Sequence, residues 1–199
     1  MYIPPYYRNE NPDELLSFVS AHPFAVICNN GQDIPVATHL PFIIRKEEKK
    51  LFLVSHFAKA NPHAGLLKEN DRVLVIFSGP NAYISPSHYE KKENVPTWNY
   101  IAVHATGKIN LLHSDSEKEK ILLDTIMNFD PEYKKQWDEL PSNYISGMMK
   151  GIVAFEIEVT DLEGKFKLSQ NKTASEQKKI SDAPGMPEEL ASHMKKNIS

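Results

Sequence analysis

Apolar and polar residues alternate along much of the chain, as they do in half-buried β-strands. The clearest case is residues 99–112, NYIAVHATGKINLL, where every second residue from Ile101 is apolar until Gly107 predicts a bend or bulge. Residues 152–159, IVAFEIEV, alternate in the same way. By contrast, residues 72–79, RVLVIFSG, are almost continuously apolar, which predicts a strand buried on both faces.

Shorter segments complete the predicted sheet. Strands are expected at residues 23–31 and 34–44, and at residues 50–56, which the charged turn RKEEKK joins to the preceding strand as a hairpin. A further strand, NAYISPS, is expected after a Gly-Pro turn. About seven strands of antiparallel character predict a small β-barrel.

Helices are predicted outside this barrel. Residues 12–18 form a short helix, and Asn61 followed by Pro62 begins another that ends near Asn70. Residues 113–129 start with a capping box from Ser114 to Glu117, and two short helices follow before Gly151.

The fold class predicted from these patterns is β-rich α+β, an antiparallel barrel with peripheral helices. Residues 1–199 are expected to form one domain with a helical insert at about 113–150. A polar tail from about residue 173 is expected to be helical in SEQKKI and PEELASHMKK, and such tails are often mobile.

Composition narrows the function. The chain has 199 residues, of which 41% are hydrophobic and 25% charged, as in ordinary globular domains. Its net charge of −3 offers no electrostatic footprint for nucleic acid. It has no apolar run long enough for a membrane helix and no signal-peptide pattern, so we expect a cytoplasmic protein.

Chemical motifs mostly exclude functions. HExxH, GxSxG, P-loop, GxGxxG and CxxC motifs are absent, and the lone Cys28 in FAVIC reads as a small buried hydrophobe. His39, His56 and His63 could be imagined as a metal site, but the specific ligand spacing is missing, so no metal is predicted. No catalytic residue is assigned.

Polar side chains at predicted strand ends are the positive signal. Lys59 precedes the helix that begins at Asn61, and a cation beside free backbone N–H groups is a common way to hold phosphate. Trp98 and Asn99, in VPTWNY, would supply a flat wall and an amide for a planar heteroaromatic ring. Core or dimer-interface packing is the alternative role for Trp98.

These segments resemble the PaiB family of flavin-binding negative transcriptional regulators, which share the split β-barrel of the pyridoxamine-phosphate oxidase type. The resemblance rests on MYIPPYYRNENP, AHPF, THLP, HFAKANPH, VIFSGPNAYISPSHY, VPTWNY, VHATG, GIVAFEIEV and EGKFKLSQNK. VPTWNY and KLSQN are the most specific of these, because neither follows from a strand or turn requirement.

The resemblance implies FMN bound at the interface of a homodimer. On the matching positions, it implies that His56, Lys59 and Asn61 lie near the phosphate and ribityl chain, and His39 is included in the site. It further implies that Thr97, Trp98 and Asn99 border the ring system. The C-terminal segment would close the site with Lys167, Ser169, Gln170 and Asn171.

Two positions depart from the family pattern: His88 stands where a tryptophan is expected, and Lys172 where an arginine is usual. The resemblance implies repression of sporulation and degradative-enzyme genes, exerted indirectly if the acidic chain does not bind DNA. A flavin-dependent oxidoreductase acting on a small substrate is the alternative, and a dimeric scaffold with a vestigial pocket is the third.

Overall fold

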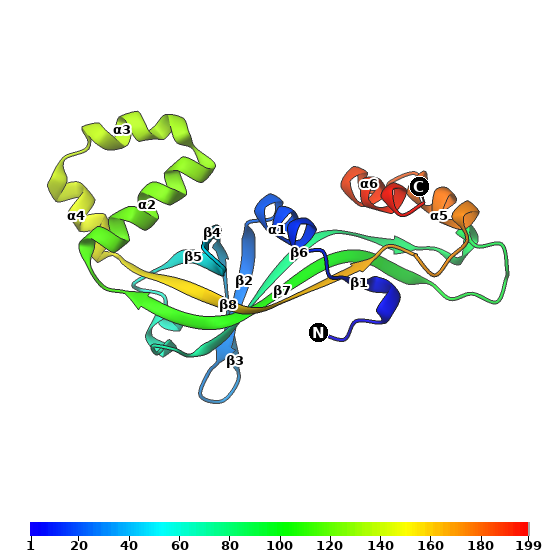
Figure 1. Ribbon diagram of the computed structural model, residues 1–199, viewed down its shortest axis with the longest axis horizontal. Helices are drawn as coiled ribbons and strands as arrows, with labels where there is room; N and C mark the ends of the chain where they lie inside the picture. Colours follow the sequence, from blue (N-terminus) through cyan, green and yellow to red (C-terminus); the bar gives the residue numbers. More distant parts are fainter. Residues whose placement is uncertain (199) are drawn as a thin grey trace. The chain divides into compact units, whose positions relative to one another are not determined.

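The computed structural model describes residues 1–198, in which an antiparallel sheet of eight strands is the main element (Figure 1). The strands are β1 (Arg8–Asn9), β2 (Phe24–Asn30), β3 (Pro35–Pro41), β4 (Ile43–Glu47), β5 (Lys50–Ala58), β6 (Arg72–Ile84), β7 (Thr97–Leu112) and β8 (Ile152–Lys167). The α-helices are α1 (Pro12–Ala21), α2 (Asp115–Phe129), α3 (Lys134–Glu139), α4 (Ser142–Lys150), α5 (Ala174–Ser181) and α6 (Glu188–Lys196). Short 3₁₀ helices are η1 (Pro5–Tyr7), η2 (Pro62–Leu66), η3 (Pro86–His88) and η4 (Pro131–Tyr133).

The order of strands identifies the fold. It is β3-β2-β6-β7-β8-β5-β4, and β1 pairs with β8 beside this path. The two ends of the order, β3 and β4, are not paired with each other, so the sheet is not closed. This is the split β-barrel with peripheral helices, and the predicted fold class is confirmed.

The chain divides into two compact units. Unit 1 comprises Met1–Phe18, Phe77–His104 and the chain from Glu163 onward, and unit 2 comprises Val19–Ile76 and Ala105–Leu162. That the whole chain forms one domain stays a prediction.

Aromatic packing builds the core of unit 2. Phe57 and Phe155 are fully buried, with ring centroids 5.1 Å apart, and Phe42 meets Phe155 edge-on at 6.2 Å. Gly107 lies where β7 approaches β8, since a Cβ on it would stand 2.4 Å from the carbonyl oxygen of Glu158. Close backbone approach explains this glycine.

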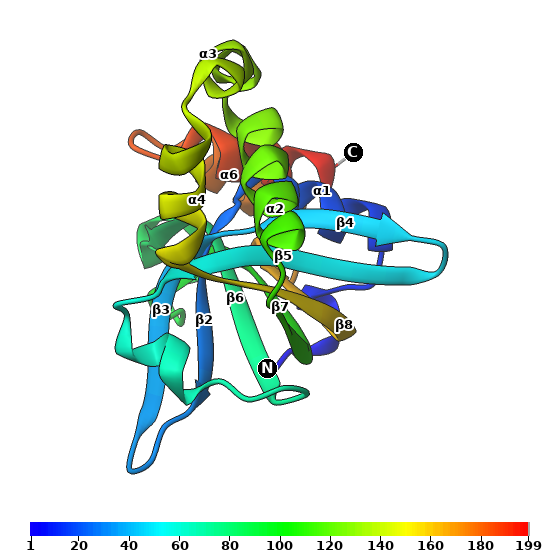
Figure 2. The same cartoon turned by 90° about the vertical axis from the view of Figure 1, so that its left-hand side faces the viewer.

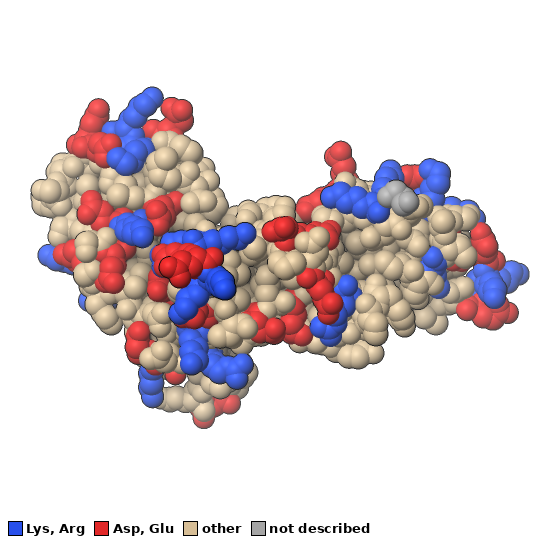
Figure 3. Space-filling view, viewed as in Figure 1, with Lys and Arg blue, Asp and Glu red and all other residues tan. Residues whose placement is uncertain are grey.

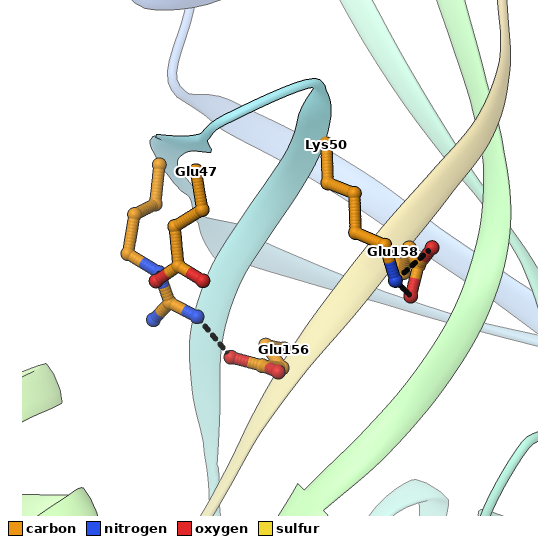
Figure 4. A network of polar contacts seen from close by, with 5 residues as sticks. Glu47, Lys50, Glu156 and Glu158 are labelled. Atoms are coloured by element: carbon orange, nitrogen blue, oxygen red, sulfur yellow. Dashed lines mark hydrogen bonds and ion pairs between the residues drawn. The ribbon is translucent and has the colours of Figure 1, made fainter.

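Charged side chains link three neighbouring strands of unit 2 (Figure 4). Arg45 on β4 donates a hydrogen bond to Glu156 on β8 and pairs with Glu47 at 2.8 Å. Lys50 at the start of β5 pairs with Glu158 at 2.9 Å. The predicted hairpin is present, with Glu47 opposite Lys50, and the pairs to Glu156 and Glu158 join both of its strands to β8.

The helical insert follows β7 in unit 2, and α2 and α4 lie side by side (Figure 2). The predicted capping box of Ser114 and Glu117 is present at the start of α2. Ile121 is the buried residue of α2, whereas Phe129 at the end of the helix is 48% exposed.

The polar tail contributes apolar residues to unit 1. Helices α5 and α6 form at the predicted segments, and Ile180, Leu190 and Met194 are fully buried. Both helices are amphipathic, so a segment that is polar on average still has a core-facing side.

Three element boundaries differ from the predictions. The strand expected at 34–44 is two strands, because Pro41 has no N–H for the ladder and the two halves pair with different neighbours, β2 and β5. The two strands expected around Gly79-Pro80 are one strand, β6, since the fixed φ of proline fits extended backbone. The helix expected at 61–70 is only the 3₁₀ helix η2, although Asn61 caps it as predicted.

Candidate functional site

The end of β5 presents two polar side chains, those of His56 and Lys59. His56 is half-buried on β5, and burial lowers the pKa of its imidazole. Lys59 is exposed just beyond the strand, and its backbone N–H donates to the carbonyl of Gly151 at 2.8 Å. Within residues 1–198, neither side chain forms a hydrogen bond or an ion pair. Both groups are therefore open to a ligand while the backbone that carries Lys59 is held.

Asn61, by contrast, belongs to a saturated network. Its side-chain oxygen accepts from the His63 N–H at 3.0 Å, and its amide donates to Thr38 Oγ1 at 3.4 Å. Thr38 Oγ1 lies 2.8 Å from His63 Nδ1, and His63 Nε2 lies 2.8 Å from Asn29 Oδ1. Because Asn29 Oδ1 can only accept, the proton of neutral His63 lies on Nε2 and Thr38 donates to Nδ1. Asn61 thus shapes the turn after Lys59.

This network predicts a pH-dependent contribution to stability. His63 is 2% exposed, and burial lowers its pKa below the ordinary value of 6.5. The unfolded chain therefore takes up the proton first, so this stability is complete above about pH 6.5 and is lost as pH falls through the lower pKa of the folded state. Urea unfolding of His63→Gln should show a smaller loss of stability between pH 7.5 and 5 than the wild type.

Burial also lowers the pKa of His56 and His104, so some dependence on pH should remain in that variant. His113→Gln, which removes an exposed imidazole, is the matched control and should behave as the wild type. An unchanged dependence on pH in His63→Gln would contradict the assignment.

His39 lies apart from this network. It is exposed on β3, its ring stacks on Phe24 with centroids 6.0 Å apart, and strand alternation puts it on the face opposite Thr38. Within unit 2, the structure therefore does not bring His39 together with Asn61.

Unit 1 holds a small polar cavity, which contains five of the predicted residues. It has a volume of about 160 Å³ and is lined by Tyr7, Tyr89, Asn94, Val95, Thr97, Asn99, Lys167, Ser169, Asn171 and Lys172. The ammonium of Lys167 donates to Thr97 Oγ1 and, at 2.7 Å, to the carbonyl of Trp98. Burial, and then the charge of Lys165, lowers the pKa of Lys167.

Asn99 and Ser169 bond to each other at the back of this cavity. Asn99 is fully buried, and its amide lies 2.9 Å from Ser169 Oγ. Ser169 has a positive φ of 65°, a conformation that costs a residue other than glycine free energy unless its surroundings hold it. Gln170 provides that support, because its amide donates to the Phe166 carbonyl at 2.5 Å and accepts from the Leu168 N–H at 2.8 Å.

Trp98 is not brought together with Thr97 and Asn99. Successive residues of β7 point to opposite faces, and Trp98 borders a different hollow of about 350 Å³ with Tyr100 and Ser78. Its ring is 52% exposed and meets that of Tyr83 edge-on, with centroids 6.1 Å apart. The aromatic wall and the amide that VPTWNY suggested therefore face opposite ways.

The predicted site set missed several cavity residues. Tyr7, Tyr89, Asn94 and Val95 lie in segments without a chemical motif, and Lys172 was noted only as a departure from a family pattern. Lys172 donates to Asn94 at 2.7 Å and lies 4.0 Å from the centre of the Tyr89 ring. The position of Lys172 directly after the KLSQN segment was the one feature of the sequence that could have placed it in the site.

Other classes of site find little support. Among residues 1–198, no three His, Cys, Asp or Glu side chains are grouped to hold a metal ion. Burial raises the pKa of the partly buried Cys28 thiol, which opposes a nucleophilic role. In the described chain, no helix is long and apolar enough to cross a membrane.

The open antiparallel sheet with peripheral helices defines the class of the protein: a split-barrel protein of the flavin-binding type. The chain belongs to the PaiB family, since residues 1–161 match the family model described as "Putative FMN-binding domain". The match includes His56, Lys59 and Thr97 to Asn99 and ends before the KLSQN segment.

Relatives agree with this assignment. The chain is 40% identical over 182 residues to "Protease synthase and sporulation protein PAI 2" of Bacillus subtilis, covering 88% of this chain and 85% of that protein. Two solved structures at 14% identity share the fold. They are a flavocytochrome from Azotobacter vinelandii (TM-score 0.62; 83% and 72% of the two chains) and an FAD- and haem-binding protein from Mycobacterium smegmatis (TM-score 0.61; 81% and 73%).

Proposed function

We propose that the chain is an FMN-binding regulator that represses sporulation and protease genes as part of a homodimer, with His56 and Lys59 in contact with the cofactor. The observation that carries this proposal is the pair of unpartnered side chains at the end of β5, inside the family match. A half-buried imidazole without a hydrogen-bond partner is uncommon unless a ligand or water supplies one. An exposed ammonium on a fixed backbone suits the FMN phosphate.

The remaining predicted contacts have less support than His56 and Lys59. Asn61 orders the turn that carries Lys59. In a homodimer, each subunit would contribute part of the site, so we keep the residues of unit 1 as proposed contacts: Thr97, Trp98, Asn99, Lys167, Ser169, Gln170 and Asn171. Among them, Trp98 is the one whose exposed ring is free to stack on a flavin. His39 is the least supported, because no neighbouring predicted residue contacts it.

The regulatory part of the proposal rests on the relative named for protease synthesis and sporulation. On the face shown in Figure 3, Lys and Arg lie among Asp and Glu rather than in a basic patch. The net charge of −3 likewise gives no attraction to DNA. We therefore place repression downstream of binding to a partner rather than in direct reading of DNA.

The visible absorption spectrum tests the cofactor. Purified protein is incubated with excess FMN, and the unbound flavin is then removed. The protein should keep a two-band flavin spectrum, because bound FMN stays with the protein when free FMN is removed. Folded, dimeric protein that stays colourless would contradict the proposal.

Two further assays separate the alternatives. A gel-shift assay on genomic fragments at stated salt should show no specific complex if repression is indirect. Rapid reduction of bound flavin by a nicotinamide cofactor would instead favour the oxidoreductase, in which the flavin itself supplies the redox chemistry.

A further inference from the structure

The polar cavity of unit 1 is lined by positively charged side chains and by no negatively charged ones. Its ten lining residues include two lysines, Lys167 and Lys172, and no aspartate or glutamate. Glu176 lies outside this wall, and its carboxylate accepts from the backbone N–H groups of Glu90 and Thr173 at 2.9 and 3.2 Å. These hydrogen bonds, together with the charge of Lys172, lower the pKa of the Glu176 carboxyl. Two ammonium groups thus share a partly open cavity whose wall contains no carboxylate.

The hydrogen-bond donors of the cavity are partly free, whereas its side-chain acceptors are occupied. The acceptors are occupied: Asn94 Oδ1 accepts from Lys172, and Asn171 Oδ1 accepts from the Tyr7 hydroxyl at 3.1 Å. Donors remain. Within the described chain, the Tyr89 hydroxyl and the Asn171 side-chain N–H₂ have no hydrogen-bond partner. Of the three N–H groups on each ammonium, Lys172 uses one on Asn94, and Lys167 uses two on Thr97 and the Trp98 carbonyl. A cavity with spare donors and filled acceptors is complementary to an anion.

Size limits what the anion can be. The volume of about 160 Å³ equals that of roughly five water molecules and falls below the roughly 300 Å³ at which pockets for larger ligands begin. We propose that this cavity is a binding site for a small oxyanion, a carboxylate or phosphate group, separate from His56 and Lys59. In this assignment the five lining residues named above as flavin contacts bind the anion instead: Thr97, Asn99, Lys167, Ser169 and Asn171.

Inorganic phosphate and acetate are the probes, titrated separately by calorimetry into flavin-free protein at an ionic strength held constant with chloride. Binding of either anion is expected, and the stronger of the two identifies the phosphate or carboxylate source. Lys172→Met should lower the affinity by about tenfold or more, the usual effect of losing a charged hydrogen-bond donor.

The variant Tyr89→Phe distinguishes a loss of anion binding from a loss of folding stability. The substitution keeps the ring against which Lys172 lies and removes a hydroxyl that has no partner in residues 1–198, so the melting temperature should not change. Anion affinity should fall by about fivefold, the effect of one neutral hydrogen bond. Lys179→Met, which removes an exposed lysine of α5, is the matched control and should bind as the wild type does.

Three results would overturn the inference: no binding of either anion at millimolar concentration, equal affinity in Lys172→Met, or unchanged affinity in Tyr89→Phe. A fourth test uses the FMN-loaded protein, in which anion binding should persist. Loss of anion binding there would assign the cavity to the flavin site and overturn its separate identity. Because the first titrations use flavin-free protein, a failure to bind FMN leaves them valid.

Discussion

Replacing Lys59 with alanine should weaken FMN binding by about tenfold to a hundredfold, the range that follows from losing one charge-assisted hydrogen bond. Lys59 is exposed, and its side chain has no partner among residues 1–198, so its truncation should leave the fold intact. Its N–H bond to Gly151 belongs to the backbone and survives the substitution. A fluorescence titration of FMN into each variant measures the affinity.

The matched control is Lys49→Ala in the exposed turn between β4 and β5, which makes the same change in net charge. It should bind FMN as the wild type does, because exposed charges more than about 10 Å apart are largely screened at physiological salt. Equal affinities in the Lys59 and Lys49 variants would remove Lys59 from the site. His56→Gln should then be tested alone, since the half-buried imidazole is the other unpartnered group.

The second large effect concerns stability at the same strand end. Phe57→Ala should lower the free energy of unfolding by about 3–5 kcal/mol, as large-to-small substitutions of core phenylalanines do. Phe57 is fully buried between the rings of His63 and Phe155, each with its centroid 5.1 Å away. A typical domain is stable by only about 5–15 kcal/mol, so this loss would bring many chains close to unfolding. Urea denaturation followed by circular dichroism measures it.

Phe129→Ala provides the comparison, because that ring is 48% exposed at the end of α2. Its replacement should change stability by no more than about 0.5 kcal/mol. A similar loss in both variants would contradict the position of Phe57 in the core. Phe57→Leu, which keeps most of the apolar volume, should bind FMN and thereby separate loss of folding from loss of a cofactor contact.

The position of Phe57 links stability to the proposed site. Phe57 lies between His56 and Lys59 in sequence and packs on His63, whose network orders the turn at Asn61. The ligand-facing side chains are therefore held by a strand whose neighbouring residues are buried. Such support from a packed element is what keeps a binding group in position without a ligand.

Local sequence was sufficient to predict much of this protein. Alternation in residues 99–112 and 152–159 predicted long strands because the side chains of a strand alternate between faces whatever the neighbours are. The capping box at Ser114 and the cap at Asn61 were predictable for a similar reason, since both satisfy N–H groups within a few residues. The PaiB motifs added the split barrel and the flavin.

Tertiary structure alone decided which polar side chains remain open to a ligand. A side-chain amide can contact a ligand, and three predicted site residues have one: Asn61, Asn99 and Gln170. Each of these amides is hydrogen-bonded to a partner within the fold. His56 and Lys59 differ from them because neither side chain forms a hydrogen bond or an ion pair within residues 1–198. Hydrogen bonds such as that between Asn99 and Ser169 join residues 70 positions apart, so no local pattern could reveal them. Sequence therefore determined the elements and the candidate groups, and packing determined which of those groups are free to act.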